Sequence, residues 1–252
     1  MMQDADQVVI VTGAASGIGK ACTEHLLQSG RRVVAADIDA ERLMDTYGSG
    51  SNTLALRVCD VSDPANCAAA VNFAAKTFGR LDALLHWAGR HSIKTWDALT
   101  ADDFDQLLRV NVTGSFLIAQ AAARQMITDG NGGSIVLTGS TAVIHAPIGG
   151  TAGNGGPAYV TSKMAITGMV RSLARALGPH AIRVNAIAPG VTETPMIGNY
   201  SDETRRLQIA TSPLGRIGSA EEVAEAGAML IGSAARYVSG EVIIVNGATA
   251  FG

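Results

Sequence analysis

Charged and aromatic residues are scarce in this chain of 252 residues, at 16% and 4% of the sequence. Basic residues do not outnumber acidic ones, and the formal net charge is −3. A surface that binds nucleic acid or anionic lipid through its charge needs a basic excess. The composition therefore predicts that neither nucleic acid nor a membrane surface is the partner of this protein.

Cysteine is also rare, with three residues at Cys22, Cys59 and Cys67. Their odd number and their spacing, which contains no CxxC pair, are not those of a disulfide framework or a zinc site. No run approaches the roughly 18 apolar residues of a membrane span, and the polar start does not resemble a secretory signal. We therefore expect a cytoplasmic protein without a bound metal.

Hydrophobic residues (47%) and glycine (29 residues, without a regular period) are abundant, which excludes a disordered or a fibrous chain. Short β-branched runs alternate with longer segments of helical spacing, and no linker interrupts them. This order predicts a single domain over residues 1–252, an α/β fold with a doubly wound, Rossmann-type sheet of about seven parallel strands and helices on both faces. The strands are expected near residues 8–11, 32–35, 54–56, 83–85, 134–137, 183–184 and 242–245.

Capping residues indicate where several helices begin and end. A helix over about 17–28 is expected to stop at Gly30, and another to start at Pro64, directly after Ser62-Asp63. The last helix begins with the capping-box pattern of residues 219–222. Two long helices are expected over about 102–128 and 158–178.

A glycine-rich turn, residues 12–19, joins the first expected strand to the first helix. In a dinucleotide site, Gly13 would allow the tight turn, Gly17 would let the backbone approach the pyrophosphate, and Gly19 would let the helix pack closely on the sheet. A glycine pattern alone fits an ordinary turn equally well. The candidate phosphate-binding residues are Gly13, Ala15, Ser16, Gly17, Ile18 and Gly19.

Asp37, at the end of the second expected strand, favours the dinucleotide interpretation. It lies eighteen residues after Gly19, the distance at which a carboxylate accepts the hydroxyls of the adenosine ribose. The same carboxylate would repel a 2′-phosphate, and the neighbouring positions Ser16 and Ile38 offer no arginine to neutralise one. The sequence therefore predicts NAD rather than NADP as the cofactor.

Tyr159 and Lys163 stand four residues apart near the start of a helix, so their side chains share one face. A free tyrosine has a pKa near 10, and we expect the ammonium, together with an oxidised nicotinamide, to lower it. The phenol could then exchange a proton with an alcohol or a ketone. Ser140, which follows an expected strand, offers a hydroxyl that can hold the substrate oxygen.

Taken in order, these motifs resemble those of the classical short-chain dehydrogenase/reductase family over nearly the whole chain. The resemblance rests on the ordered set rather than on any single motif. The matching positions are Thr12–Gly19, Asp37, Asp60, Val61, Ala88, Gly89, Asn111, Ser140, Tyr159, Lys163, Asn185, Pro189, Gly190 and Thr194.

The resemblance implies four catalytic residues. Tyr159 would be the acid/base, and Lys163 would lower its pKa and hold the nicotinamide ribose. Ser140 would orient the substrate oxygen, and Asn111 would anchor a water that links Lys163 to solvent.

The resemblance also implies further cofactor contacts. Asp60 and Val61 would bracket the adenine. The segment after the sixth strand would seat the carboxamide. Together with Ile38, Tyr159 and Lys163, the remaining cofactor-binding positions are Trp87, Ala88, Gly89, Pro189, Gly190, Thr192 and Thr194.

Two features depart from the family pattern. The family usually has Asn-Asn where this chain has His86-Trp87, and we interpret His86 as a hydrogen-bonded core residue. Ser140 and Tyr159 are 19 positions apart, which is more than usual, and the glycine-rich residues 141–157 form either a lid that governs substrate choice or a surface loop without a role.

The leading hypothesis is an NAD-dependent oxidoreductase that interconverts a secondary alcohol and a ketone. An NADPH-dependent ketoacyl-type reductase and a catalytically silent NAD-binding regulator are the alternatives. The substrate is a small molecule whose identity the sequence leaves open. Its pocket is expected to include Arg90, His91, Lys94, Trp96, Thr141, Ala142, His145 and the segment after Thr194.

Broad apolar faces on the helices near 102–128 and 158–178 predict contacts between copies of the chain. The family usually pairs these helices between subunits. We therefore expect a homo-oligomer, a tetramer with two-fold axes.

Overall fold

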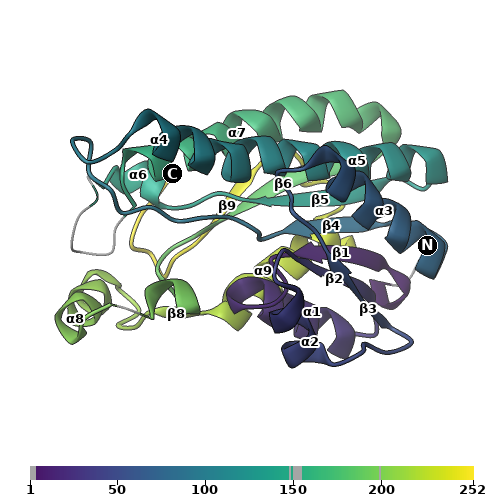
Figure 1. The fold of residues 1–252 in the computed structure, drawn as a ribbon, viewed down its shortest axis with the longest axis horizontal. Helices are drawn as coiled ribbons and strands as arrows, with labels where there is room; N and C mark the ends of the chain where they lie inside the picture. The colour runs from purple at the N-terminus through teal and green to yellow at the C-terminus, as the bar shows by residue number, and fades with distance from the viewer. Residues whose placement is uncertain (1–3, 148, 150–154, 199) are drawn as a thin grey trace.

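A computed structural model describes residues 4–147, 149, 155–198 and 200–252. Parallel strands form a seven-stranded sheet in the order β3-β2-β1-β4-β5-β6-β9 (Figure 1). This sheet confirms the predicted fold class, and each expected strand is present. The strands are β1 (Val8–Thr12), β2 (Arg32–Asp37), β3 (Leu54–Val58), β4 (Ala83–His86), β5 (Gly133–Thr138), β6 (Ile182–Pro189) and β9 (Val242–Val245).

The central strands are buried on both faces, as their continuous apolar runs predict. Every residue of β1 is buried, and its side chains alternate between two hydrophobic clusters. Ile10 joins the cluster under one helical layer, whereas Val9 and Val11 join the cluster under the other. These two apolar layers are the main source of stability, because burial of apolar surface is the dominant favourable term in folding.

Helices cover the two faces of the sheet in separate layers (Figure 1). The layer above the sheet in that view contains α3 (Pro64–Phe78), α5 (Ser115–Asp129) and α7 (Pro157–Leu177), with α4 (Ala101–Leu108) packed against α7. The layer below contains α1 (Gly17–Gln28), α2 (Ala40–Tyr47) and α9 (Ala220–Ile231).

The expected caps are present at α3 and α9. Asp63 accepts a hydrogen bond from the backbone of Ala65 at the start of α3. Ser219 and Glu222 form the reciprocal capping box at the start of α9. These local contacts satisfy backbone N–H groups that a helix start leaves unpaired.

The helix expected over 102–128 is not continuous. A π-helical segment, η2 (Arg109–Gly114), separates α4 from α5 and contains Asn111. Within it, a Cβ on Gly114 would come within 3.2 Å of the Val61 carbonyl oxygen, so the chain passes close to the turn after β3. The spacing of apolar residues over 102–128 did not indicate this wider turn.

Several short elements were not expected from the sequence. They are α2 (Ala40–Tyr47), α6 (Ala142–His145), α8 (Asp202–Thr211), the paired β7 (Thr192–Glu193) and β8 (Gly218–Ser219), and the short 3-10 helices η1 (Asp4–Asp6), η3 (Gly178–His180), η4 (Pro195–Ile197) and η5 (Ser233–Ala235). Residues 148 and 150–154, most of the glycine-rich part of the expected lid, lie outside the described residues.

The sheet order reverses between β1 and β4, since the chain passes from β1 to β2 and β3 on one side and then returns to β4 on the other. Open α/β sheets bind ligands at such a point, beyond the carboxyl ends of the strands. In Figure 1, α6 and α8 lie at this end of the molecule.

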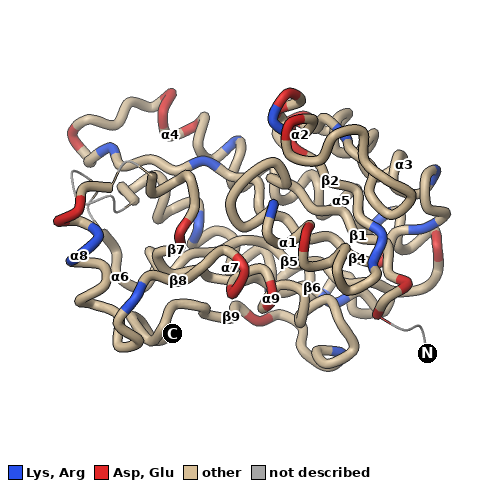
Figure 2. Tube along the Cα trace, turned by 90° about the horizontal axis from the view of Figure 1, so that it is seen from below, with Lys and Arg blue, Asp and Glu red and all other residues tan. Residues whose placement is uncertain are grey.

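Charges do not divide the molecule into a basic and an acidic half. Figure 2 shows lysines and arginines interspersed with aspartates and glutamates around the described chain. No helix among the described residues combines the length and the apolar character that a membrane span requires.

Candidate active site

A cavity of about 940 Å³ lies beyond the carboxyl ends of the central strands. It extends from Asp37 at the end of β2 to Tyr159 at the start of α7 and to α8. All predicted cofactor positions except Ala15 line it, and so do the predicted catalytic residues except Asn111. One cavity therefore joins motifs that are far apart in the sequence.

The turn between β1 and α1 has no room for side chains at its glycines. Gly13 has φ +68°, and a Cβ there would lie 2.8 Å from the Ala88 nitrogen. Gly17 has φ +52° and faces Thr194, which would be 3.2 Å from a Cβ. This narrow backbone cradle at the amino end of α1 fits the diphosphate of a dinucleotide.

Gly19 lets the first turn of α1 come close to the end of β1. A Cβ on Gly19 would lie 2.1 Å from the carbonyl oxygen of Gly13, within the same turn. The start of α1 therefore packs directly against the residue that follows β1, which leaves no space for a side chain at position 19.

Asp37 is held in position by the backbone of the turn. Its Oδ2 accepts a hydrogen bond from the Ala15 nitrogen at 3.0 Å, and its Oδ1 accepts one from the Asp39 nitrogen at 3.1 Å. Ala15 thus supports Asp37 without lining the cavity. The side chain of the neighbouring Ile38 is 65% exposed and brings no charge to this corner. A carboxylate in this position could accept hydrogen bonds from the hydroxyls of a ribose.

The expected adenine residues form the next part of the cavity wall. Asp60 Oδ1 accepts hydrogen bonds from both the nitrogen and the hydroxyl of Ser62 at 2.8 Å, which fixes the turn after β3. Val61 is buried, and the sulfur of Cys67 lies 3.2 Å from its carbonyl oxygen. Cys59 also lines the cavity, a position that the sequence did not single out.

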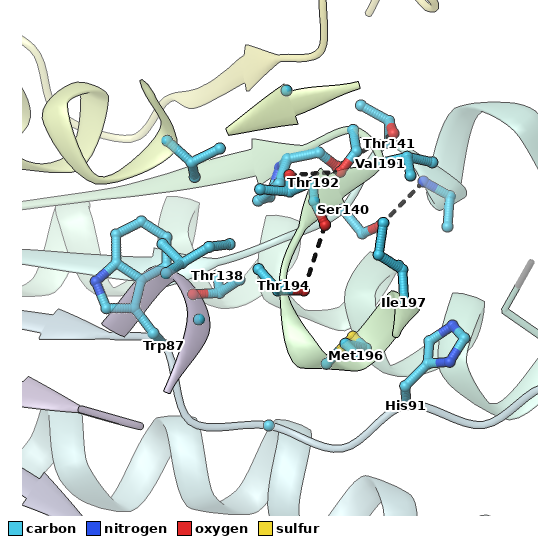
Figure 3. A pocket seen from close by; sticks show the side chains of 18 of the residues that line it. Trp87, His91, Thr138, Ser140, Thr141, Val191, Thr192, Thr194, Met196 and Ile197 are labelled. Carbon is cyan, nitrogen blue, oxygen red and sulfur yellow. Dashed lines mark hydrogen bonds between the residues drawn. The ribbon is translucent and has the colours of Figure 1, made fainter. Parts of the chain in front are cut away.

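The segment after β6 is fixed by its own threonines. The Thr192 hydroxyl donates to the Gly190 oxygen at 3.0 Å, and the Thr194 hydroxyl donates to the Thr192 oxygen at 3.3 Å (Figure 3). A Cβ on Gly190 would lie 2.8 Å from the Cβ of Asn246, so the chain after β9 approaches it closely. Pro189, Gly190, Thr192 and Thr194 all face the cavity, where a carboxamide would bind.

Lys163 is buried at the base of the cavity, with 5% of its surface exposed. Its Nζ donates to the carbonyl oxygen of Thr138, at the end of β5, over 2.9 Å. The same Nζ lies 5.8 Å from the centre of the Tyr159 ring. Burial lowers the pKa of Lys163 to about 8, because the protein withdraws the ammonium from water.

In the protein alone, the Tyr159 pKa moves in the direction opposite to the one expected. Desolvation raises it, a hydrogen bond with Ser140 lowers it, and the nearby Tyr200 raises it. Lys163 is not among the groups that shift the Tyr159 pKa, and its ammonium donates to the Thr138 carbonyl instead. Ser140 is itself fixed by a hydrogen bond from the Ala142 nitrogen at 3.1 Å.

Asn111 is buried and does not line the cavity. Its Oδ1 accepts from the Arg90 nitrogen at 2.8 Å, and its Nδ2 donates to the Arg90 oxygen at 2.9 Å and to the Ser162 hydroxyl at 3.0 Å. These bonds join the loop after β4 to α7. Because the amide is occupied by protein, a water link to Lys163 would have to use the backbone of Asn111, and that role stays a prediction.

The structure gives defined positions to both residues of the His86-Trp87 pair. His86 is buried, with Nδ1 2.7 Å from the Thr12 hydroxyl and Nε2 2.9 Å from the Ser115 hydroxyl, which confirms a hydrogen-bonded core residue. Burial, followed by repulsion from Lys163, lowers the His86 pKa to about 3. Trp87 lines the cavity and lies against Gly227 of α9, where a Cβ would be 2.7 Å from its ring.

The far end of the cavity contains part of the expected substrate pocket. His91 packs edge-on against Tyr159, with ring centres 4.6 Å apart. Lys94 and Trp96 were expected there, but neither lines the cavity. Lys94 pairs with Asp103 at 2.6 Å, and 80% of the Trp96 surface is exposed.

Apolar side chains from the segment after Thr194 and from α8 complete this end. Figure 3 shows Met196, Ile197 and His91 on one side of the pocket, with Thr138 and Trp87 farther along it. A Cβ on Gly155 would lie 2.2 Å from Cδ1 of Tyr159, so the described end of the 141–157 segment touches the phenol ring. Gly155 of the 141–157 segment and Tyr200 of the segment after Thr194 line the cavity, whereas the sequence did not single out the lining residues Leu207 and Leu214.

Comparison with known proteins places this geometry among oxidoreductases. Residues 13–248 match the family described as enoyl-(acyl carrier protein) reductase. The chain is 35% identical over 250 residues to a 3alpha-hydroxysteroid dehydrogenase of Mediterraneibacter gnavus, and the match covers 96% of each chain. It is also 35% identical over 245 residues to a 3-oxoacyl-(acyl-carrier-protein) reductase of Thermotoga maritima, again over 96% of each.

A solved structure shows the same fold. A short-chain dehydrogenase/reductase (glucose/ribitol dehydrogenase) from Brucella melitensis superposes with a TM-score of 0.89 at 29% identity, covering 100% of this chain and 98% of that one. The similarity thus extends over the whole domain rather than over the dinucleotide motif alone.

Proposed function

Because the chain belongs to the classical short-chain dehydrogenase/reductase family, we propose that it is an NAD-dependent oxidoreductase that interconverts a secondary alcohol and a ketone. The observation that carries this proposal is the group formed by Tyr159, Ser140 and Lys163. It lies in the wall of the cavity that begins at the glycine cradle after β1. A cradle for a dinucleotide and a group that transfers protons are the two parts that such a reaction needs.

Each side chain of this group has a separate role in the proposed reaction. A bound nicotinamide supplies or accepts the hydride. Tyr159 gives a proton to the ketone oxygen, or takes one from the alcohol, and the Ser140 hydroxyl holds that oxygen in place. Lys163, fixed by the Thr138 carbonyl, holds the nicotinamide ribose. Once an oxidised nicotinamide is bound, its positive charge adds to that of the ammonium and favours the phenolate.

Asp37 supports NAD as the cofactor. The carboxylate is held by two backbone nitrogens at the corner where the adenosine ribose would bind. A 2′-phosphate there would meet a fixed negative charge. Arg42, the nearby cation on α2, already faces Asp39 at 3.6 Å.

A ketoacyl-type reductase that uses NADPH is the second candidate, favoured by the similarity to 3-oxoacyl-(acyl-carrier-protein) reductases. The position of Asp37 opposes NADPH. A catalytically silent NAD-binding regulator would not need the proton-transfer group, so turnover with any alcohol or ketone rejects that alternative.

We also propose a homotetramer. Ile118, Ala122 and Met126 of α5 face the sheet, whereas Phe116 and Ile127 of the same helix are 39% and 40% exposed. Met164 of α7 is 51% exposed. Apolar side chains on the outer faces of both helices are suited to pairing across two-fold axes. A cytoplasmic location stays a prediction.

The first prediction concerns the cofactor. The kcat/KM with NAD should exceed that with NADP by at least about tenfold, because Asp37 repels the 2′-phosphate. Asp37→Ala should narrow the ratio, whereas Asp45→Ala, which removes an exposed carboxylate of α2, should leave it unchanged. Steady-state kinetics with both cofactors measures this, and equal efficiencies in the unaltered protein would contradict the assignment.

The second prediction concerns proton transfer. Tyr159→Phe keeps the ring against His91 and Gly155 but removes the acid/base oxygen, so turnover should fall by at least about 100-fold. NAD affinity and the unfolding midpoint should change little. In the unaltered enzyme, the rate of alcohol oxidation should rise with pH as the phenol ionises. Near-normal turnover in the variant would refute the role of Tyr159.

The third prediction concerns assembly. Sedimentation at micromolar concentration should give the mass of a tetramer. Phe116→Arg should shift the protein to smaller species, because it places a charge on the proposed contact face. A monomer mass for the unaltered chain would overturn the proposal.

A further inference from the structure

His86 lies where the dinucleotide turn, β4 and the π-helical segment meet. It stands opposite Thr12 in the parallel pairing of β1 and β4, so the two side chains point to the same face of the sheet. That face is covered by α5, which supplies Ser115. The imidazole therefore bridges two hydroxyl groups, one at each ring nitrogen.

The direction of each hydrogen bond follows from counting protons. The Ser115 hydroxyl donates its single proton to the Asn111 carbonyl oxygen at 2.6 Å, and a carbonyl oxygen can only accept. The Ser115 oxygen therefore has no proton left to offer His86. Since Nε2 lies 2.9 Å from that oxygen, Nε2 must carry a hydrogen and donate it.

The other ring nitrogen must then be an acceptor. Full burial, together with the charge of Lys163, keeps the imidazole neutral, so Nδ1 carries no proton. The Thr12 hydroxyl donates to Nδ1 over 2.7 Å, and the Thr12 oxygen accepts from the Ala88 nitrogen at 3.3 Å. The bonds run in one order from Ala88 through Thr12, His86 and Ser115 to Asn111.

The two ends of this series of hydrogen bonds, Ala88 and Asn111, both hold the loop after β4. Ala88 is at its start, and Asn111 holds both backbone groups of Arg90 two residues later. Gly89 lies between them, and a Cβ there would be 3.2 Å from Asn111 Oδ1 and 3.7 Å from Lys163 Nζ. The loop therefore forms the part of the cavity wall next to the lysine.

A second route joins His86 to the lysine through the backbone. The Thr138 hydroxyl donates to the His86 carbonyl oxygen at 2.5 Å, and the Thr138 carbonyl accepts from Lys163. His86 thus contacts no reacting atom, yet its side chain and its carbonyl fix the loop and the lysine on either side of the proposed nicotinamide position.

We propose that His86, held as the neutral Nε2–H tautomer, is a positioning residue that fixes the 88–90 loop and the Asn111 segment beside Lys163. The effect on turnover rests on the proposed function, whereas the tautomer does not. Sequence patterns predict His86 only as a core residue, because its hydroxyl partners come from β1 and α5 and are brought together by the fold.

Nitrogen NMR of the histidine-labelled protein tests the tautomer without any turnover. The chain has five histidines, and the His86 signal is assigned by its loss in His86→Gln. We expect a protonated Nε2 and an unprotonated Nδ1 that do not change between about pH 5 and 8, where a free histidine titrates. Protonation on Nδ1, or titration in this range, would overturn the proposal.

Two substitutions of His86, each of which keeps one of its two hydrogen-bonding positions, test the positioning role. His86→Gln places an amide nitrogen near the former Nε2 and can still donate to Ser115, whereas His86→Asn reaches only the Thr12 side. We expect Asn to lower kcat by about 10- to 100-fold with little change in the KM for NAD, and Gln to retain most of kcat. Equal losses in the two variants would refute a role through Ser115 and Asn111.

Ser115→Ala supplies the matched control for this route. Alone it should lower kcat to a similar extent as His86→Asn, and the double variant should show no further loss, because both changes break the same link. Fully additive losses would show that the two residues act separately and would contradict the proposal. If the unaltered enzyme shows no turnover, the proposed function fails while the NMR result still decides the tautomer.

Discussion

The active site depends on keeping one lysine side chain out of water. Lys163 is buried beneath the cavity, and the Thr138 carbonyl accepts from its ammonium. A buried charge is costly unless polar groups replace the water that it loses. The end of β5, the loop after β4 and the start of α7 must therefore meet at this ammonium, and these segments also form the proposed nicotinamide site.

Burial also explains why Tyr159 is not ready to accept a proton in the protein without a cofactor. Burial raises the pKa of Tyr159, which keeps the phenol protonated, and lowers that of Lys163 to about 8, which still leaves most of the ammonium charged at pH 7. A bound oxidised nicotinamide would add a positive charge close to the phenol and favour the phenolate. The protein thus provides a dry site and fixed hydroxyl groups, and we infer that proton transfer waits for the cofactor to bind.

Local patterns in the sequence were sufficient for the architecture. The β-branched runs predicted all strands of the large sheet, and Asp63 and Ser219 marked helix starts, because both signals act within a few residues. The ordered motifs also identified most of the cavity wall. Such local patterns predict structure because they depend only on the burial and the backbone conformation of a single segment.

Features that depend on contacts between distant segments could not be predicted in the same way. The requirement for Gly19 arises from the Gly13 carbonyl, and the removal of Lys94 from the pocket arises from Asp103. The π-helical turn at Asn111 divides a helix that the apolar spacing predicted as continuous. The direction of the Tyr159 pKa shift reflects three-dimensional burial, which a spacing of four residues does not report.

The central claim, that the site is built around a desolvated lysine, is tested by titrating Lys163 itself. The chain has four lysines, so NMR of the labelled side-chain ammonium groups is practicable, with Lys163→Met assigning the signal. The account predicts a pKa of about 8 for Lys163 in the protein without nucleotide. A value at the usual lysine pKa of about 10.4 would show that water reaches the ammonium and would contradict the account.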